Sequence, residues 1–252
     1  MIDKFLLFGL FIGLGAIVTG NIVEGGSTGH LIQLGAAFIV FGGTAGAVLV
    51  SFPAYDLKLG LKGLKIALLD RKIKNEERLL IEEIIGLLVI ARKKGLLAVE
   101  KELSSIENRF LRENMRMVVD GYEASVIRDV VLKKIKNFED EVKTASKVFE
   151  SAGGYAPTIG IIGAVLGLIH VLQNITEPSK IGTGIAIAFV ATIYGVGSAN
   201  LIFIPLAKRI IQKAKREIRK NLLVLKGIEG IEKGVNPAYL RDILESIREK
   251  QL

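Results

Sequence analysis

Four long apolar runs without a single Asp, Glu, Lys or Arg divide the chain. They cover about residues 5–23, 31–50, 155–173 and 182–206. A helix needs about 20 predominantly apolar residues to cross a bilayer, and each run is long enough to do so. Because the first two runs, like the last two, are separated by short polar loops, the pattern predicts four transmembrane helices arranged as two hairpins. The first run is interpreted as a retained span rather than a cleaved signal peptide.

The segment between the two hairpins is polar but has helical periodicity. From 75 to 94, apolar residues recur at helical spacing: Leu79, Leu80, Ile84, Ile85, Leu88 and Ile90. Gly95 is predicted to end this helix, since glycine is common just past a helix C-terminus. A second helix is expected over about 97–119, with an interruption near Asp120 and Gly121. The central segment is therefore expected to fold as a helical domain.

The third and fourth runs both continue as helices outside the apolar segment. No turn signal separates the helical pattern that begins near Ser125 from the third run until Gly153, and the fourth run continues through Leu222. A last helix is predicted from Asn236 and Pro237, an N-cap followed by proline at the first helical position, to about Glu249. The fold class predicted is an all-α integral membrane protein with four transmembrane helices and a helical cytoplasmic domain.

Basic residues give the orientation of the four spans. Of the 34 Lys and Arg residues, those outside 51–150 and 207–252 are Lys4 and Lys180. By the positive-inside rule, both termini and the central domain are expected in the cytoplasm. The predicted organisation is a first transmembrane hairpin (1–52), a cytoplasmic helical domain (53–150), a second transmembrane hairpin (151–206), and basic cytoplasmic C-terminal helices (207–252).

Several function classes lack the residues that they need. The chain has no Cys and two His, and it contains no P-loop, H-E-x-x-H or G-x-S-x-G sequence. We therefore expect no enzyme activity, no cofactor and no bound metal. The formal net charge of +8 accompanies a mean hydropathy of +0.44. The basic excess follows the fourth run, where it is interpreted as an anchor at anionic lipid headgroups rather than a nucleic-acid site.

The spans carry small residues in place of charges. Intramembrane ionisable residues usually mark ion pathways, and their absence argues against a self-sufficient pump. Gly9 and Gly13, and also Gly163 and Gly167, form G-x-x-x-G pairs that let helices approach closely. These glycines serve either packing within one subunit or packing between subunits of a homo-oligomer.

Two segments resemble a known family. Residues 153–172 (GGYAPTIGIIGAVLGLIHVL) and 186–210 (AIAFVATIYGVGSANLIFIPLAKRI) are similar to the third and fourth membrane helices of the MotA family. These proteins are the ion-conducting stator subunits of the bacterial flagellar motor. The order of hairpin, cytoplasmic domain, hairpin and basic tail also matches, and residues 90–100 (IARKKGLLAVE) resemble the family's rotor-facing segment.

The resemblance implies roles for four membrane residues. Pro157 and Pro205 match the two prolines that the family needs for torque, and Thr192 matches a threonine near the ion path. Ala164 occupies a position that holds threonine in many sodium-driven relatives, which favours protons slightly over sodium. Gly154 departs from members that carry Asp three residues before the proline, so the route between the ion path and the cytoplasm is left open.

The resemblance also implies an assembly in the bacterial inner membrane. Arg92 and Glu100 match a charged pair that meets the rotor protein FliG. Family members form a ring of five around two single-span MotB chains, which supply the essential aspartate and the peptidoglycan anchor. The expected function is to couple proton or sodium flow to torque in flagellar motility and chemotaxis.

Proline chemistry is consistent with these roles. A proline inside a helix leaves the carbonyl four residues back without its donor, which would be the carbonyl of Gly153 for Pro157 and of Leu201 for Pro205. Such a carbonyl is tolerated at membrane depth where a cavity, water or a partner satisfies it. The alternatives are a structural scaffold whose prolines are only kinks, and an ExbB- or TolQ-like energiser of outer-membrane processes, which normally has three spans.

Overall fold

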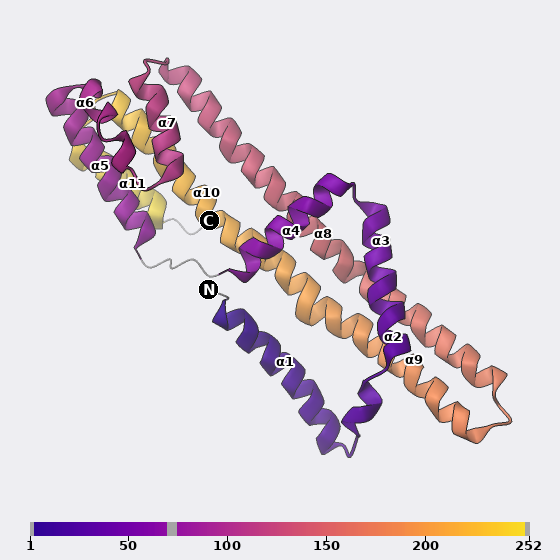
Figure 1. Cartoon of the computed structure of the whole chain (residues 1–252). Helices are drawn as coiled ribbons and strands as arrows, with labels where there is room; N and C mark the ends of the chain where they lie inside the picture. Colours follow the sequence, from indigo (N-terminus) through magenta and orange to yellow (C-terminus); the bar gives the residue numbers. More distant parts are fainter. Residues whose placement is uncertain (1–2, 70–74, 250–252) are drawn as a thin grey trace. The chain divides into compact units, whose positions relative to one another are not determined.

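The fold is built from helices throughout the part that the structure, a computed structural model, describes (Figure 1). That part comprises residues 3–69 and 75–249, without the side chains at positions 30 and 178–180. In chain order the elements are α1 (Lys4–Val23), the 3₁₀ turn η1 (Thr28–Leu31), α2 (Leu34–Ala37), the π-helical turn η2 (Phe38–Gly42), α3 (Gly43–Ser51), α4 (Ala54–Leu68), α5 (Glu76–Lys94), α6 (Leu96–Glu100), the 3₁₀ turn η3 (Leu103–Ser105), α7 (Arg109–Val119), α8 (Ala124–Gln173), α9 (Pro178–Ser198), the π-helical turn η4 (Ala199–Phe203), α10 (Ile204–Glu232) and α11 (Pro237–Glu249).

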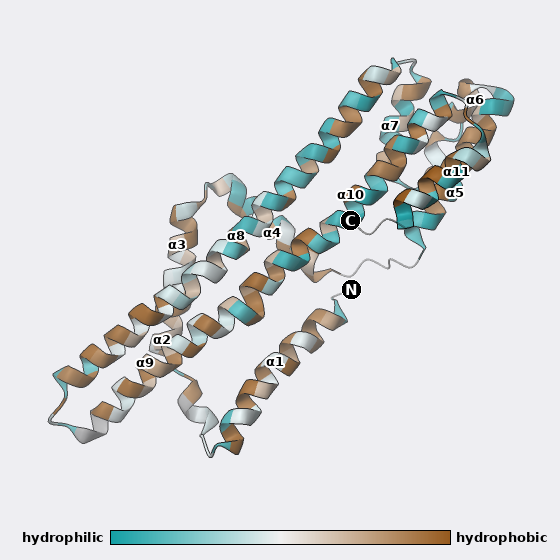
Figure 2. Ribbon diagram, turned by 180° about the vertical axis from the view of Figure 1, so that it is seen from behind, coloured by the Kyte–Doolittle hydropathy of each residue, from teal (hydrophilic) through white to brown (hydrophobic). Residues whose placement is uncertain are grey.

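The four predicted spans are helices of sufficient length and hydropathy to cross a membrane. They are α1, the run α2–η2–α3, the C-terminal part of α8, and the run from α9 into α10. Figure 2 shows the hydrophobic colour concentrated on α1, α9 and the C-terminal part of α8, whereas the N-terminal part of α8 is largely hydrophilic. The predicted continuity of the third span with the helix before it is confirmed, because α8 runs for 50 residues.

The chain forms two compact units. The first, here called the membrane unit, consists of Met1–Asp70 and Val142–Ile211. The second, here called the cytoplasmic unit after the location that the sequence predicts for it, consists of Arg71–Glu141 and Gln212–Leu252. The membrane unit contains α1 to α4, α9, η4 and the adjoining parts of α8 and α10. The cytoplasmic unit contains α5 to α7, α11 and the remaining parts of α8 and α10.

In the membrane unit, α4 is an amphipathic helix that docks through two glycines. A Cβ on Gly63 would lie 2.7 Å from the Cβ of Ala145, and one on Gly60 would lie 3.2 Å from Val148. Glycine at both positions therefore allows α4 to approach α8 more closely than any side chain would. This separate helix within the predicted 53–150 domain was not anticipated from the sequence.

An ion pair holds the N-terminal end of α1. Asp3 caps the helix by accepting from the N–H of Phe5 at 3.1 Å, and its carboxylate pairs with Arg209 on α10. The N–H of Asp3 donates to the carbonyl of Leu68 at 2.9 Å, and the Arg209 Nε donates to the carbonyl of Ala67 at 3.3 Å. Asp3 and Arg209 together thus join α1, the end of α4 and α10.

The cytoplasmic unit has a conventional apolar core. Side chains from α5, α7, α8, α10 and α11 meet there, and the largest that are fully buried are Ile81, Ile84, Leu88, Ile106, Leu111, Met115, Ile127, Leu223, Ile228, Leu240 and Leu244. The predicted helix over 75–94 is confirmed as α5, with Gly95 after it at a φ of 80°. The last helix is confirmed as α11.

The single helix expected over 97–119 is wrong. The segment instead forms α6, η3 and α7, and the break falls where Ile106 adopts an extended conformation with a ψ of 115°. Asn108 then starts α7 as its N-cap, accepting from the N–H of Leu111 at 2.9 Å. Burial of Leu103 and Ile106 in the core offsets the helical hydrogen bonds that the turn gives up.

Candidate functional site

The third and fourth spans touch along a seam of small residues. A Cβ on Gly195 would lie 2.5 Å from the carbonyl oxygen of Ala156, and one on Gly160 would lie 2.9 Å from the carbonyl oxygen of Ala191. Further along, a Cβ on Gly167 would lie 2.7 Å from the N atom of Ala188. Distances this short mean that the two backbones are in direct contact, which only glycine permits.

The glycines of the spans thus divide into two groups. Gly160, Gly163, Gly167, Gly184 and Gly195 pack inside the chain, whereas a Cβ on Gly9, Gly42 or Gly46 would have nothing within 4 Å. Packing within one subunit therefore explains the Gly163 and Gly167 pair. The open glycines lie on α1 and on the second span, where no part of the described chain covers them.

Pro157 lies inside α8, next to Ala156 at one end of this seam. The helix continues through it, so the proline removes one hydrogen bond and leaves the carbonyl of Gly153 without its usual donor. Gly153 is buried, and a Cβ there would lie 2.7 Å from Ile204 and 3.5 Å from Phe203. Gly153 therefore packs against the segment of the fourth span that directly precedes Pro205.

The fourth span has a backbone defect larger than the one predicted. The chain makes a π-helical turn at η4, so that the N–H of Ile204 donates to the carbonyl of Ala199, five residues back. The N–H of Ile204 is therefore not available to the carbonyl of Asn200, and Pro205 has no N–H to donate to the carbonyl of Leu201. Two successive carbonyls lack their α-helical donors, where the sequence indicated one. Such π turns are frequent at functional sites.

The hydroxyl groups near the seam are bonded to their own helices. Thr192 is half-buried and donates to the carbonyl of Ala188 at 3.2 Å, and Ser198 donates to the carbonyl of Gly195 at 3.2 Å. Each hydroxyl oxygen keeps a lone pair that can accept a hydrogen bond. Ala164 and Thr192 follow directly after Gly163 and Ala191, which are in contact, so the structure brings these two predicted residues to the same level of the seam.

A tyrosine fastens the second span to the fourth. The Tyr194 hydroxyl donates to the carbonyl of Leu31 at 2.6 Å and accepts from the N–H of Gln33 at 3.3 Å. Its ring stacks on Phe41 with the centroids 5.9 Å apart. At the other end of the second span, the hydroxyls of Ser51 and Tyr155 are 2.8 Å apart. Sequence reasoning missed Tyr194, because no motif distinguishes it from other membrane tyrosines.

Neither carboxylates nor basic side chains lie inside the seam. The four apolar runs contain none, and the described residues include no group of three or more His, Cys, Asp or Glu that could hold a metal ion. What the site offers is a line of bare backbone, three carbonyls without their α-helical donors, and weak hydroxyl acceptors. Such a wall can accommodate water or a partner's charged group, but it has no proton carrier of its own.

The two predicted rotor-contact residues lie on different helices of the cytoplasmic unit. Arg92 is in the last turn of α5 and Glu100 ends α6, with the Gly95 corner between them. Both side chains are exposed. The Arg92 Nη1 donates to the carbonyl of Val235 at 3.3 Å, which orients the guanidinium at the surface. The pair therefore straddles a corner rather than sharing one helical face.

Shifted carboxylate pKa values occur in the cytoplasmic unit. The pKa of Glu82 is lowered because its carboxylate accepts hydrogen bonds from the exposed Arg241 guanidinium. Burial raises the pKa of Glu83, although the N–H of Glu107 donates to its carboxylate at 3.0 Å. Both groups belong to surface contacts between helices, not to the membrane seam.

Comparison with known proteins finds relatives that match almost the whole chain in sequence and in structure. Residues 102–222 match the profile of the MotA/TolQ/ExbB proton channel family. The chain is 32% identical over 247 residues to Motility protein A of Bacillus subtilis, covering 96% of this chain and 89% of that protein. It superposes on a chain of the C. jejuni MotAB structure with a TM-score of 0.91 at 29% identity, covering all of both chains. A chain of the flagellar MotAB stator complex from Bacillus subtilis gives a TM-score of 0.87 at 30% identity, covering 96% of this chain and 94% of that one.

Proposed function

The chain belongs to the MotA/TolQ/ExbB proton channel family and is a membrane-embedded flagellar stator subunit of the Motility protein A type, and we propose that it forms one wall of an ion path whose carboxylate comes from a MotB-type partner. Its function is to couple transmembrane ion flow to torque on the rotor. In this role it is an ion channel rather than an enzyme.

The seam between α8 and the fourth span carries this proposal. It has two prolines, a π turn and carbonyls without α-helical donors, yet no ionisable group. Unpaired carbonyls at membrane depth need water or polar partners. A single-span partner that presents an aspartate to this wall supplies the missing proton carrier. Pro157 and Pro205, with Ala164 and Thr192 at the next level, are the residues proposed to act in ion passage and torque coupling.

Exposed apolar surface supports a homo-oligomer. No residue of α1 is buried, and Phe5 and Phe11 are 84% and 77% exposed. Gly9, Gly42 and Gly46 also have open space next to them. Lipid covers part of this surface, and neighbouring copies in a ring of five around two partner chains cover the rest. Ion loading of the partner's aspartate changes the fit between this ring and the inner helices and so turns the ring.

The cytoplasmic unit is proposed to meet the rotor. In the bacterial inner membrane with both termini in the cytoplasm, Arg92 and Glu100 face the cytoplasm and are available to FliG. Their exposure and their placement on two sides of a corner suit charge-to-charge contact with a moving surface. No bound cofactor is needed.

Protons are the proposed coupling ion, ahead of sodium. Sodium must exchange its water for several oxygen ligands, whereas a proton needs a carboxylate and a chain of water. Ala164 provides no hydroxyl, so at this level of the seam the Thr192 oxygen would be a single ligand where sodium needs several. The exposed Gly154 supplies no carboxylate, which leaves the mouth of the path to water alone.

The test is motility of a flagellated host that lacks its own stator genes. Co-expression of this chain with its MotB-type partner should restore swimming, and neither chain alone should do so. Swimming speed should be independent of external sodium at constant proton-motive force. Restoration of outer-membrane energisation in place of swimming would support the ExbB/TolQ alternative, which the four spans disfavour. A failure to swim with both chains inserted would contradict the proposal.

A further inference from the structure

The cytoplasmic unit contains a pocket rich in arginine. The pocket has a volume of about 350 Å³ and lies among the start of α5, the middle of α10 and the end of α11. Its lining residues are Asn75, Glu77, Arg78, Arg216, Arg219 and Arg248. Four guanidinium groups and one carboxylate give the lining a formal charge of +3. The pocket is unrelated to the membrane seam and to the proposed rotor contact.

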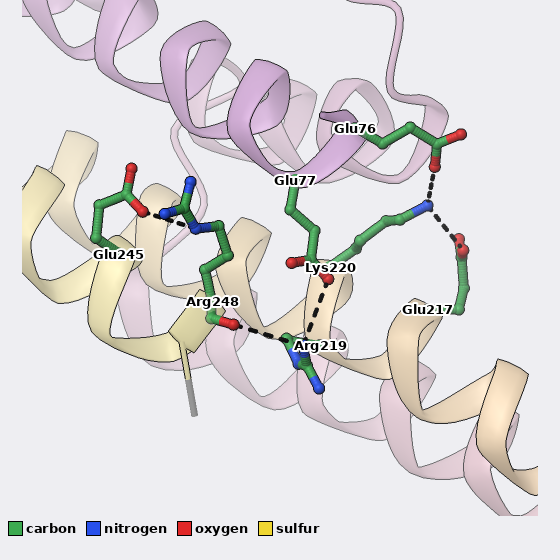
Figure 3. A network of polar contacts seen from close by, with 7 residues as sticks. All are labelled: Glu76, Glu77, Glu217, Arg219, Lys220, Glu245 and Arg248. Atoms are coloured by element: carbon green, nitrogen blue, oxygen red, sulfur yellow. Dashed lines mark hydrogen bonds and ion pairs between the residues drawn. The ribbon is translucent and has the colours of Figure 1, made fainter. Parts of the chain in front are cut away.

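Part of this charge is already paired, as Figure 3 shows. The Arg219 Nη1 lies 3.9 Å from the Glu77 carboxylate and donates to the carbonyl of Arg248 at 3.4 Å. The Arg248 Nε lies 2.9 Å from Glu245, and beside them Lys220 pairs with Glu76. These contacts join α5, α10 and α11 and hold Arg219 and Arg248 in position.

The remaining donors are unpaired. Arg78 and Arg216 are exposed, and neither makes a hydrogen bond or a close ion pair within the described chain, although the charge of Arg78 helps to lower the pKa of the nearby Glu82 carboxyl. The Arg219 Nε is buried without a hydrogen-bond partner. Asn75 gives α5 no side-chain cap, so the first N–H groups of that helix add to the positive potential. These donors together favour an anionic ligand.

We propose that this pocket binds a soluble anion carrying at least two phosphate groups. Planar guanidinium groups match phosphate oxygens with paired hydrogen bonds, and the two unpaired arginines, Arg78 and Arg216, favour a ligand with more than one negative charge. A volume of about 350 Å³ is at the small end of ligand pockets, which suits a diphosphate group with a small attachment. Bound there, the anion ties α5, α10 and α11 together and stiffens the helix that ends just after Arg92.

The basic segment after the fourth run was interpreted as a lipid anchor, but we exclude the pocket arginines from that anchor because the pocket lies further along α10. The first charge after the fourth span is Lys208, and Arg216 comes eight residues later on the same helix. At a rise of 1.5 Å per residue, this separation is about 12 Å. Each headgroup layer is only about 5–8 Å thick. A soluble phosphate compound is therefore the expected source of the anion.

Pyrophosphate binding to the full-length chain in phosphatidylcholine nanodiscs tests the proposal. Titration calorimetry at constant ionic strength should show saturable binding. Arg78→Gln and Arg216→Gln should each weaken the binding about tenfold, since each removes a charge-assisted hydrogen bond. Arg116→Gln is the matched control, because Arg116 is an exposed arginine of the same unit that does not line the pocket. It should bind as tightly as the unsubstituted chain.

A second arm separates the two sources of phosphate. The same variants are compared in nanodiscs that contain anionic phosphatidylglycerol, without pyrophosphate, by their thermal unfolding temperatures. If pyrophosphate fails to bind, or if all three variants weaken it equally, the proposal is overturned. A lipid-dependent stabilisation that is lost in Arg78→Gln and Arg216→Gln, without pyrophosphate binding, would overturn the soluble source and assign the pocket to lipid.

Discussion

Gly195→Ala should separate the third and fourth spans. A methyl group at this position would lie 2.5 Å from the carbonyl oxygen of Ala156 and 3.1 Å from the Cα of Gly160. Both are backbone atoms of α8 and cannot rotate away. Relief requires the helices to part by roughly 0.5–1 Å, which forfeits a quarter to a half of the dispersion energy of the atoms along the seam.

The expected destabilisation is that of an overpacked core, about 1–3 kcal/mol. Gly197→Ala is the matched control, because it adds the same methyl group two residues further along, where nothing lies within 4 Å. Alanine favours the helix over glycine by up to about 1 kcal/mol at either position, so this gain cancels in the comparison. The difference between the two variants therefore reports the seam contact alone.

The assay is thermal unfolding of both purified variants in the same detergent, with swimming speed measured alongside. Gly195→Ala should unfold at a lower temperature than Gly197→Ala and should reduce swimming. Equal unfolding temperatures would show that α8 and α9 are not in backbone contact at Gly195, and the seam would lose its structural basis.

Three further substitutions test other parts of the molecule. Pro157→Ala and Pro205→Ala should each restore a helical hydrogen bond, leave the unfolding temperature unchanged or higher, and reduce swimming several-fold; normal swimming in both would make the prolines structural kinks. Arg92→Glu should reduce torque without lowering expression, because an exposed charge contributes under about 1 kcal/mol to stability, and a compensating reversal on FliG should restore part of the torque. Asp3→Asn should lower stability by about 1–3 kcal/mol by leaving Arg209 without its carboxylate, and an unchanged unfolding temperature would show that the ion pair does not hold α1.

The sequence alone was sufficient to predict the four membrane spans, because hydropathy over about 20 residues dominates every other local preference in a membrane protein. Charge-free runs and their flanking basic residues predicted four helices, and the structure has them at α1, α2–η2–α3, α8 and α9–η4–α10. The end of α5 at Gly95 was equally clear, since a φ of 80° favours glycine strongly.

The break between α6 and α7 was not predictable by the same means. The residues from 97 to 119 have an acceptable helical pattern, and no proline or glycine interrupts them. The chain leaves α6 after Glu100 and becomes extended at Ile106, whose side chain is buried in a core contributed mostly by distant segments. Tertiary packing overrides local propensity here.

The candidate site was predicted in its residues but not in its geometry. Pro157 and Pro205 indicated two carbonyls without donors, whereas the π turn at η4 adds a third, that of Asn200. A π turn contains one residue more than a turn of α-helix, and the sequence around it carries no distinctive signal. That Gly153 packs against Phe203 and Ile204 also depends on the register between two helices, which a single sequence does not specify.

Ion flux through reconstituted liposomes tests most directly whether this chain supplies a wall and its partner supplies the charge. Proton uptake driven by a potassium diffusion potential would be measured for this chain alone, for this chain with its MotB-type partner, and for the pair with the partner's membrane aspartate changed to asparagine. The shared site predicts flux above background only for the unsubstituted pair. Robust proton or sodium flux through this chain alone would contradict it.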